Sequence, residues 1–322
     1  MIQTQQRIGL RTVIFAPSIG PYIRQSYIGD LGMWSRRTAE LVTVTALMAG
    51  TVLVAQTRKE FKFPVGPHAG ISVVNPYGSI SVKPSANGTV FVNAIVHSDK
   101  VEVDNNQSGN RVDIQSHLLP GADAQSGRVD YEIQVPADAS ITLHSSTGSL
   151  HAEKLHGDVS LEGPGAEVDV RDISDAHVHV KTMNGAVNLD NITNGHVEVD
   201  SLSGTITLNS VNGSLVQVVS TSGRINYIGD FGNSGEYRLT SHSGDIEATI
   251  PEWTSADVTA RSVRGEVQDD IPLQPKTHTF LALEKGRAFA GTMGRVAMSS
   301  TVVLRTFSGK IHLRKRTDKQ SQ

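Results

Sequence analysis

The sequence predicts an all-β repeat protein, and three observations lead to that prediction. Apolar residues alternate with polar residues in short runs, the runs are separated by turns that contain glycine, and the strongest turns recur about every 20 residues. From Phe61 onward, no stretch of any length carries the period of an amphipathic helix. We therefore expect strands throughout this part of the chain.

The alternating runs are the predicted strands. Each run places its apolar residues on one face and its polar residues on the other, as in a half-buried strand. In chain order they are centred on 71–73, 80–82, 101–103, 112–114, 131–135, 148–152, 159–161, 168–170, 178–180, 187–189, 197–199, 206–208, 215–218 and 225–227. From 148 onward, consecutive runs begin about nine or ten residues apart, so two strands make one repeat.

Glycine marks the corners between the predicted strands. The strongest turn glycines are Gly148, Gly165, Gly185, Gly204, Gly223, Gly244 and Gly265, and a further Ser-Gly pair ends at Gly309. A chain that reverses direction between short strands needs a positive φ, which glycine adopts at the least cost. We therefore expect left-handed backbone conformations at the repeat glycines.

Two architectures fit a chain of short strands with glycine corners. In a β-solenoid, each unit of about 20 residues forms one coil, and equivalent strands of successive coils pair in parallel. In an antiparallel β-sandwich or meander, each Asn-Gly or Ser-Gly pair is a hairpin turn. Every second strand begins after a similar Asn-Gly or Ser-Gly pair, as at Asn184-Gly185, Ser203-Gly204 and Ser222-Gly223. Only the solenoid requires such a period of two strands. The β-solenoid is therefore the predicted fold, with the sandwich or meander as the alternative.

The N-terminal part of the chain has a different composition. Residues 41–55 form an uncharged run of 15 that follows Arg36 and Arg37. A bilayer-spanning helix needs about 20 apolar residues, whereas the apolar region of a signal peptide needs about 7–15. We predict a signal peptide or a single N-terminal anchor over 33–55. Residues 1–32 are predicted to be a non-structured leader or an over-extended reading frame.

The rest of the chain is predicted to be one all-β repeat domain over 60–314, with the clearest repeats at 144–266. Residues 270–300 depart from the repeat. We expect this segment to form a cap, because an uncovered last coil would expose strand edges. The basic residues 315–322 are predicted to be a disordered tail.

Composition excludes several classes of function. The 322 residues contain no cysteine, which excludes disulfide frameworks, cysteine-ligated metals and thiol nucleophiles. A net charge of −3 argues against a nucleic-acid partner, which would require a basic face. The sequence has no Gly-x-Ser-x-Gly elbow, phosphate loop or dinucleotide fingerprint. We predict no nucleic-acid partner and no cofactor.

Histidine and aspartate patterns are the candidates for metal sites. His177 and His179 point to the same face of a strand, a spacing that is compatible with metal binding. Comparable polar positions hold His144, His151, His156, His196 and His242, and aspartates follow predicted strands at Asp169, Asp190 and Asp200. The nine-residue repeat of calcium-binding solenoids is absent. We interpret both sets as solvated surface residues and assign no metal site.

A carbohydrate-active β-helix enzyme is the main alternative function. Such a site needs two or three carboxylates, or a base with Lys or Arg, on one face. The candidate carboxylates are Glu153, Asp158, Glu162, Glu167 and Asp169, with Lys154 and Arg171 nearby. They follow no repeated offset, and aromatic residues, at 5% of the chain, offer little surface for stacking sugars. No catalytic residue is therefore assigned.

The order of several motifs resembles the putative bacterial adhesin family, a domain of unknown function in exported envelope proteins, and its head-GIN auto-transporter-type relatives. The matching residues are 75–82, 131–136, the Ser/Asn-Gly repeats of 147–250, Ile250-Pro251 and 304–313. The resemblance covers about 60–314 and implies a β-solenoid-like fold. It brings no catalytic residues.

Together these features predict a non-enzymatic, exported protein of the bacterial cell envelope that acts as an adhesin or a scaffold. Its predicted location is the periplasm, the outer membrane or the cell surface. The expected partner is a cell-surface glycan or another envelope protein, and contact with a membrane is expected only through an uncleaved N-terminal segment. Besides the polysaccharide-acting enzyme, an accessory role in an envelope-stress system remains an alternative.

Overall fold

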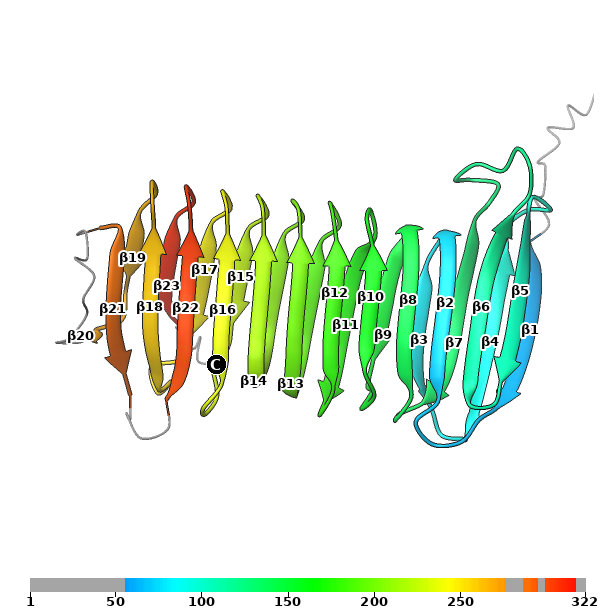
Figure 1. Ribbon diagram of the computed structural model, residues 1–322, viewed down its shortest axis with the longest axis horizontal. Helices are drawn as coiled ribbons and strands as arrows, with labels where there is room; N and C mark the ends of the chain where they lie inside the picture. Colours follow the sequence, from blue (N-terminus) through cyan, green and yellow to red (C-terminus); the bar gives the residue numbers. More distant parts are fainter. Residues whose placement is uncertain (1–55, 276–285, 295–298, 317–322) are drawn as a thin grey trace, which may run out of the picture. The chain divides into compact units, whose positions relative to one another are not determined.

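Strands stacked side by side make up the described part of the chain (Figure 1). The computed structural model describes residues 56–275, 286–294 and 299–316. The predictions for 1–32 and 33–55 lie outside these residues, as do those for most of the C-terminal tail. Within the described residues, there is no helix of the length and apolar character that crossing a membrane requires.

The strands form two hydrogen-bonded layers, which we call sheet A and sheet B. In spatial order, sheet A contains β5 (Val101–Ser108), β6 (Arg111–Leu118), β2 (Gly70–Tyr77), β8 (Ser140–Thr147), β10 (Val159–Gly163), β12 (His177–Thr182), the second halves of β13 (Val187–Ser201) and β14 (Ile206–Ser220), β16 (Glu236–Ser241), β22 (Ser300–Thr306), β18 (Ala256–Ser262), β21 (Ala288–Met293) and β20 (Gln274–Pro275).

Sheet B contains, in the same spatial order, β1 (Thr57–Pro64), β4 (Thr89–Val96), β7 (Val129–Pro136), β3 (Ile80–Ser85), β9 (Ser149–Glu153), β11 (Glu167–Ser174), the first halves of β13 and β14, β15 (Ile225–Ile228), β17 (Ile246–Ile250), β23 (Ile311–Lys315) and β19 (Val267–Asp269). A strand of sheet A followed in the chain by a strand of sheet B makes one coil.

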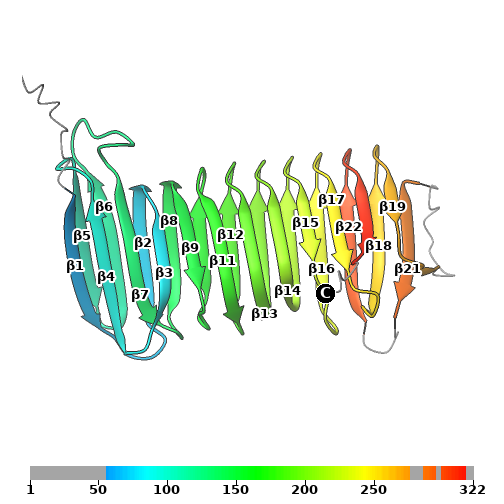
Figure 2. The same ribbon diagram turned by 180° about the vertical axis from the view of Figure 1, so that it is seen from behind.

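Parallel pairing of equivalent strands confirms the predicted β-solenoid. From β7 to β19 in sheet B and from β6 to β18 in sheet A, every neighbouring pair is parallel. The antiparallel alternative is therefore wrong for the repeats. Among the described strands, antiparallel pairs occur only at the ends of the stack, where β1, β4 and β5 lie at one end and β21 at the other (Figure 2), with β20 paired to β21.

The core consists of columns of aliphatic side chains between the two sheets. Val187, Ile206, Ile225 and Ile246 occupy the same ladder position in successive coils, and each is at most 1% exposed. Burial of one such side chain contributes about 1.5–3 kcal/mol. Because each coil covers the next, the columns are stable only as a stack.

At both ends of the stack, the order of the coils differs from the order of the chain. The coil β2–β3 lies between β6–β7 and β8–β9, and the last coil of the chain, β22–β23, lies between β16–β17 and β18–β19. Consequently Gly309 stands between Gly244 and Gly265, which the sequence analysis had treated as consecutive. The regular spacing along the chain contains no signal for this insertion.

Close backbone contact, rather than a positive φ, explains the repeat glycines. Of the seven turn glycines and Gly309, only Gly148 has a positive φ, so the expected left-handed conformation is wrong for the others. A Cβ atom on Gly204 would lie 1.8 Å from the carbonyl oxygen of Gly185, and one on Gly223 would lie 2.0 Å from that of Gly204. Except at Gly165, where a Cβ atom would lie 3.1 Å from the nearest backbone oxygen, the corners rest directly on the backbone of a neighbouring corner, which leaves no room for a side chain.

A buried hydroxyl group supports five of these glycine corners, whereas the equivalent Ser201 hydroxyl before Gly204 has no hydrogen-bond partner. Ser220 Oγ accepts a hydrogen bond from the Gly223 N–H at 2.9 Å, and Ser241 Oγ accepts one from the Gly244 N–H at 2.8 Å. The same Ser/Thr-x-x-Gly contact occurs at Thr182–Gly185, Ser262–Gly265 and Thr306–Gly309. The sequence analysis missed this motif, although its three-residue spacing is visible in the sequence.

The opposite corners use non-glycine residues in the left-handed region. Asp172 and Asn191 have φ values of 54° and occupy equivalent corners in neighbouring coils, and Ser210 follows in the next coil with 53°. Asn191 Nδ2 donates a hydrogen bond to Asp172 Oδ1 at 2.6 Å. Short polar side chains tolerate this conformation because they form local hydrogen bonds.

The described part of segment 270–300 lies at the end of sheet A. β21 pairs antiparallel with β18, and β20 pairs antiparallel with β21. At the C-terminus, β23 extends to Lys315, and the Arg316 N–H donates to the Ile250 carbonyl at 2.7 Å. The strand therefore extends to the start of the predicted tail, whose remaining residues, 317–322, lie outside the described chain.

Substitution of a corner glycine tests the backbone contact. We expect Gly204→Ala to lower the free energy of unfolding by about 1–3 kcal/mol, because the new methyl group overlaps the Gly185 carbonyl. Gly70→Ala is the matched control, since no atom lies within 4 Å of the Cβ position there. Thermal unfolding of both variants measures the difference. Equal melting temperatures would contradict the contact as the reason for glycine.

The hydroxyl contact makes a separate prediction. Ser220→Ala should cost about 1–3 kcal/mol, because it leaves the buried Gly223 N–H without a partner. Ser222→Ala removes an exposed hydroxyl from the same corner and should cost less than about 0.5 kcal/mol. Urea unfolding of the two variants provides the comparison, and Ser220→Thr should retain most of the stability. Equal losses in the two alanine variants would refute a supporting role for Ser220.

Candidate functional site

The five carboxylates of the predicted enzyme alternative lie on different sheets. Asp158 directly precedes β10 and Glu162 lies within it, in sheet A, whereas Glu153, Glu167 and Asp169 belong to β9 and β11 in sheet B. Asp158 accepts the His177 backbone N–H at 3.0 Å, so it supports a coil contact. The set does not converge on one face.

One ionic network does join residues of this set. His151 lies between two carboxylates, with Nδ1 3.0 Å from Asp169 Oδ2 and Nε2 3.4 Å from Glu153 Oε2. Lys83 Nζ lies 3.4 Å from Glu153 Oε1, and Arg171 Nε lies 2.9 Å from Asp169 Oδ1. Burial raises the pKa of Glu153, but the hydrogen bond and charge of Lys83 outweigh it and lower the pKa overall. A catalytic acid requires the opposite shift.

The histidines of β12 and β13 meet on the outer face of sheet A. His177 and His196 are ladder partners with ring centroids 5.0 Å apart. Glu198 lies 3.2 Å from His196 Nε2 and 3.5 Å from His179 Nδ1. Among the residues that the structure describes, no group of three or more histidine or carboxylate side chains has the geometry to hold a metal ion.

Asp190 and the remaining histidines of the sequence analysis take part in contacts between coils, whereas Asp200 is an exposed residue of β13. Asp190 Oδ1 accepts a hydrogen bond from Asn209 Nδ2 at 2.7 Å. His144 lies 3.7 Å from Glu162, and His156 Nδ1 lies 2.7 Å from the Ser174 hydroxyl. The His242 ring stacks on Phe307, with centroids 5.0 Å apart. These pairs bind one coil to the next.

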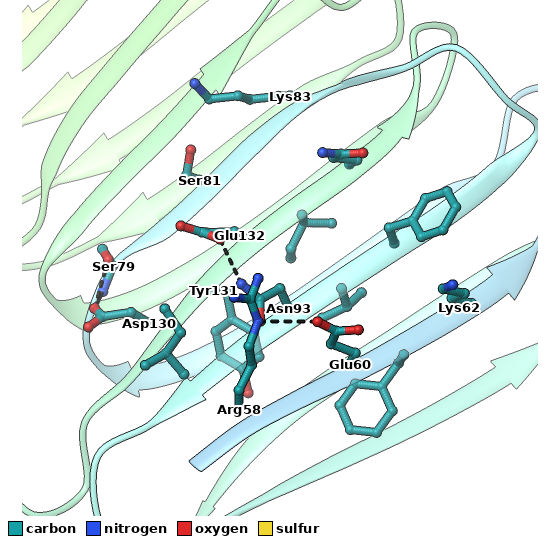
Figure 3. Close-up of a pocket in the computed structure, with 16 residues that line it drawn as sticks. Arg58, Glu60, Lys62, Ser79, Ser81, Lys83, Asn93, Asp130, Tyr131 and Glu132 are labelled. Atoms are coloured by element: carbon teal, nitrogen blue, oxygen red, sulfur yellow. Dashed lines mark hydrogen bonds and ion pairs between the residues drawn. The ribbon is translucent and has the colours of Figure 1, made fainter. Parts of the chain in front are cut away.

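A groove of about 700 Å³ lies on the outer face of sheet B at its β1 end (Figure 3). We call it the β4 groove, because β4 runs between β1 and β7 beneath it. Its outward side chains are Arg58, Glu60 and Lys62 from β1, Phe91, Asn93 and Ile95 from β4, Asp130, Glu132 and Gln134 from β7, and Ser79, Ser81 and Lys83 from β3 and the residue before it.

The ladder register arranges these side chains in rows across the strands. The central row is Glu60, Asn93, Glu132 and Ser81, each directly opposite the next. Asn93 Nδ2 donates a hydrogen bond to Glu132 Oε2 at 2.6 Å, which fixes the orientation of the amide. Asn93 Oδ1 is shielded from solvent and has no hydrogen-bond partner. The floor of the groove thus contains an acceptor that the protein itself leaves unsatisfied.

Charged groups surround this central row. Arg58 Nε lies 3.2 Å from Glu60 Oε1, and the Lys62 ammonium lies 5.4 Å from the centroid of the Phe91 ring. Lys83 is paired with Glu153 in the network described above. Figure 3 shows Arg58, Glu60, Asn93 and Glu132 gathered across β1, β4 and β7.

Asp130 closes one side of the groove as a permanent anion. Burial raises its pKa, but hydrogen bonds from the Ser79 N–H and hydroxyl, from His97 and from Arg128 outweigh this effect and hold the pKa at about 2. Beneath the groove, burial raises the pKa of Tyr131 to about 12, and its hydroxyl bonds to Ser116 in the core. Neither group can serve as a proton donor to a ligand at neutral pH.

The succession of strands and corners on this chain matches the family model described as Toastrack DUF4097 over residues 70–316. The chain belongs to the Toastrack family. This match confirms the predicted resemblance to a β-solenoid-like domain of unknown function. The relation to head-GIN adhesins stays a prediction.

Two solved structures are similar to this Toastrack protein. One is a putative cell adhesion protein from Clostridium sporogenes, with 11% identity, a TM-score of 0.28, and coverage of 81% of this chain and 100% of that chain. The other is a putative adhesin from Bacteroides fragilis, with 11% identity, a TM-score of 0.41, and coverage of 81% and 98%. TM-scores this low carry no functional argument. Among curated proteins, no significant match was found.

The sequence analysis assigned no site residue and did not single out the β4 groove of this Toastrack protein. One signal could have revealed it. In Thr89–Val96, Phe91 and Ile95 occupy positions of the alternating pattern that should be polar, on either side of Asn93. A strand that is apolar on both faces predicts a covered outer face or a binding surface.

The bonding of Asp130 predicts a loss of stability in acid. Its pKa is about 2 in the folded chain against an ordinary value of 3.8, so its contribution to stability is complete above about pH 4 and disappears as the pH falls toward 2. We expect Asp130→Asn to cost about 1.5–3 kcal/mol at pH 7, with the difference from wild type shrinking between pH 4 and 2. Urea unfolding at several pH values measures this. Glu60→Gln, at an exposed side chain, is the control, and a pH-independent difference for Asp130→Asn would contradict the assignment.

Proposed function

We propose that the protein is a non-enzymatic contact protein of the bacterial cell envelope, an adhesin or a scaffold that presents the outer faces of its β-solenoid to a partner. The observation that carries this proposal is the order of those faces. Asn188, Thr207 and Asn226 stand in register on sheet B, at the spacing of successive coils. Rigid strands hold such side chains in place before a partner arrives, which reduces the entropic cost of binding.

Chemistry of the candidate residues disfavours the enzyme alternative. The five carboxylates are divided between opposite sheets, and the shifted carboxylates Glu153 and Asp130 both have lowered pKa values. A glycoside hydrolase needs one carboxyl group with a raised pKa opposite a second carboxylate. The accessory role in an envelope-stress system stays a prediction.

Export to the envelope is supported by the sequence of the N-terminal part. The uncharged run 41–55 follows Arg36 and Arg37 and has the length of a signal-peptide apolar region. A location at the cell surface would make the polar faces of the solenoid accessible to other cells. A periplasmic location would leave only the scaffold role.

Protease treatment of intact cells that produce the full chain tests the adhesin role. We expect the protease to digest the chain on intact cells, as measured by immunoblot. We also expect cells that lack the protein to attach more weakly. A periplasmic marker protein, which must survive the treatment, is the control. Protection of the chain until the outer membrane is permeabilised would exclude the adhesin role.

A further inference from the structure

The β4 groove combines features that select a ligand class. Its outward charges are three basic residues, Arg58, Lys62 and Lys83, and three acidic residues, which are Glu60, Asp130 and Glu132. Because the two signs balance, the groove favours neither a polyanion nor a polycation. Most of these charges are already paired within the protein, as described above. The charge pattern therefore points to an uncharged ligand.

The hydrogen-bonding groups of the groove require a ligand that both donates and accepts. Glu60, Asn93 Oδ1 and Glu132 are acceptors in the central row, and Asn93 Oδ1 has no partner of its own. Lys62 and Arg58, on the two flanking rows, are donors. A hydroxyl group satisfies both kinds of neighbour, because it carries one donor proton and two acceptor lone pairs.

An apolar surface lies within the same groove. Phe91 and Ile95 are partly exposed on the outer face of β4, two residues to either side of Asn93. A sugar ring carries hydroxyl groups around its edge and C–H groups on its face. It can place the C–H face on an aromatic ring while its hydroxyls reach polar neighbours. Aromatic residues are scarce in the chain as a whole, but this ring lies beside the unsatisfied amide. A groove of about 700 Å³ lies within the range of small-ligand sites.

From these three features we infer that the β4 groove binds a neutral oligosaccharide, with Asn93 and Glu132 hydrogen-bonding its hydroxyls and Phe91 packing on its C–H face. This inference deepens the proposed function, because a glycan is one of the partners that an adhesin contacts. It assigns the contact to one end of the solenoid. Glu60 is the ladder partner of Asn93, and the Arg58–Glu60 pair is exposed, at 62% for both side chains, so these two side chains can rearrange as a sugar enters the groove.

Calorimetric titration of the purified full chain tests the inference. The probes are maltohexaose, cellohexaose and mannohexaose as neutral sugars, hexagalacturonate as an anion, and octa-arginine as a cationic peptide. We expect one or more of the neutral hexaoses to bind and both charged probes to bind at least about tenfold more weakly. Absence of binding by every neutral hexaose at millimolar concentration, or tighter binding of a charged probe, would overturn the inference.

Two variants locate the binding in the groove. Asn93→Ala and Glu132→Ala should each weaken binding of the neutral sugar by about tenfold or more, since each removes hydrogen bonds from the central row. Asn106→Ala is the matched control, because Asn106 is an exposed asparagine on β5 of sheet A and does not line the groove. Unchanged melting temperatures establish that the variants are folded. Equal binding by Asn93→Ala and wild type would place the sugar elsewhere and overturn the assignment.

The outcomes separate this inference from the proposed function. Digestion of the chain on intact cells without any sugar binding would leave the adhesin role and remove the groove assignment. Sugar binding by a chain that is protected inside the envelope would keep the groove assignment and remove the adhesin role.

Discussion

Direct contact between the backbones of successive glycine corners is the constraint on which the rest of the structure depends. At Gly185, Gly204 and Gly223, the position of a Cβ atom would fall 1.6–2.0 Å from the carbonyl oxygen of the previous corner. Corners that approach this closely lock the register of the strands on either side, so Val187, Ile206 and Ile225 form one column. Hydroxyls three residues before Gly185 and Gly223 accept hydrogen bonds from the corner N–H groups, which gives these buried donors a partner.

A locked register also determines what the outer faces can do. In a parallel ladder, equivalent positions of successive coils stand next to one another, so His177 meets His196 and Asp190 meets Asn209. Each pair stabilises the stack only modestly, because it is exposed to solvent. Several polar outward side chains between the ends therefore also connect neighbouring coils.

The sequence predicted the solenoid but not the order of its coils or its groove. Alternation and glycine spacing report local geometry, which is why most of the strands from β2 to β15 and the parallel repeat could be predicted. Insertion of β22–β23 between β16–β17 and β18–β19 depends on contacts between residues 65 or 44 positions apart, such as Leu304 with Leu239 and with Ala260, and leaves no periodic trace. The glycine corners were located correctly but explained wrongly, because close approach and positive φ select the same residue.

The groove lies at the end of the stack because the pairing changes there. β4 runs antiparallel to both β1 and β7, so its residues face strands of opposite direction and unrelated sequence. This brings Glu60, Asn93 and Glu132 into one row, a combination that no parallel repeat of a single motif would produce. The same antiparallel strands close the end of the stack, and charged β1 at the edge discourages pairing with another chain. The antiparallel pairing of β1, β4 and β7 therefore both forms the groove and protects the end of the stack.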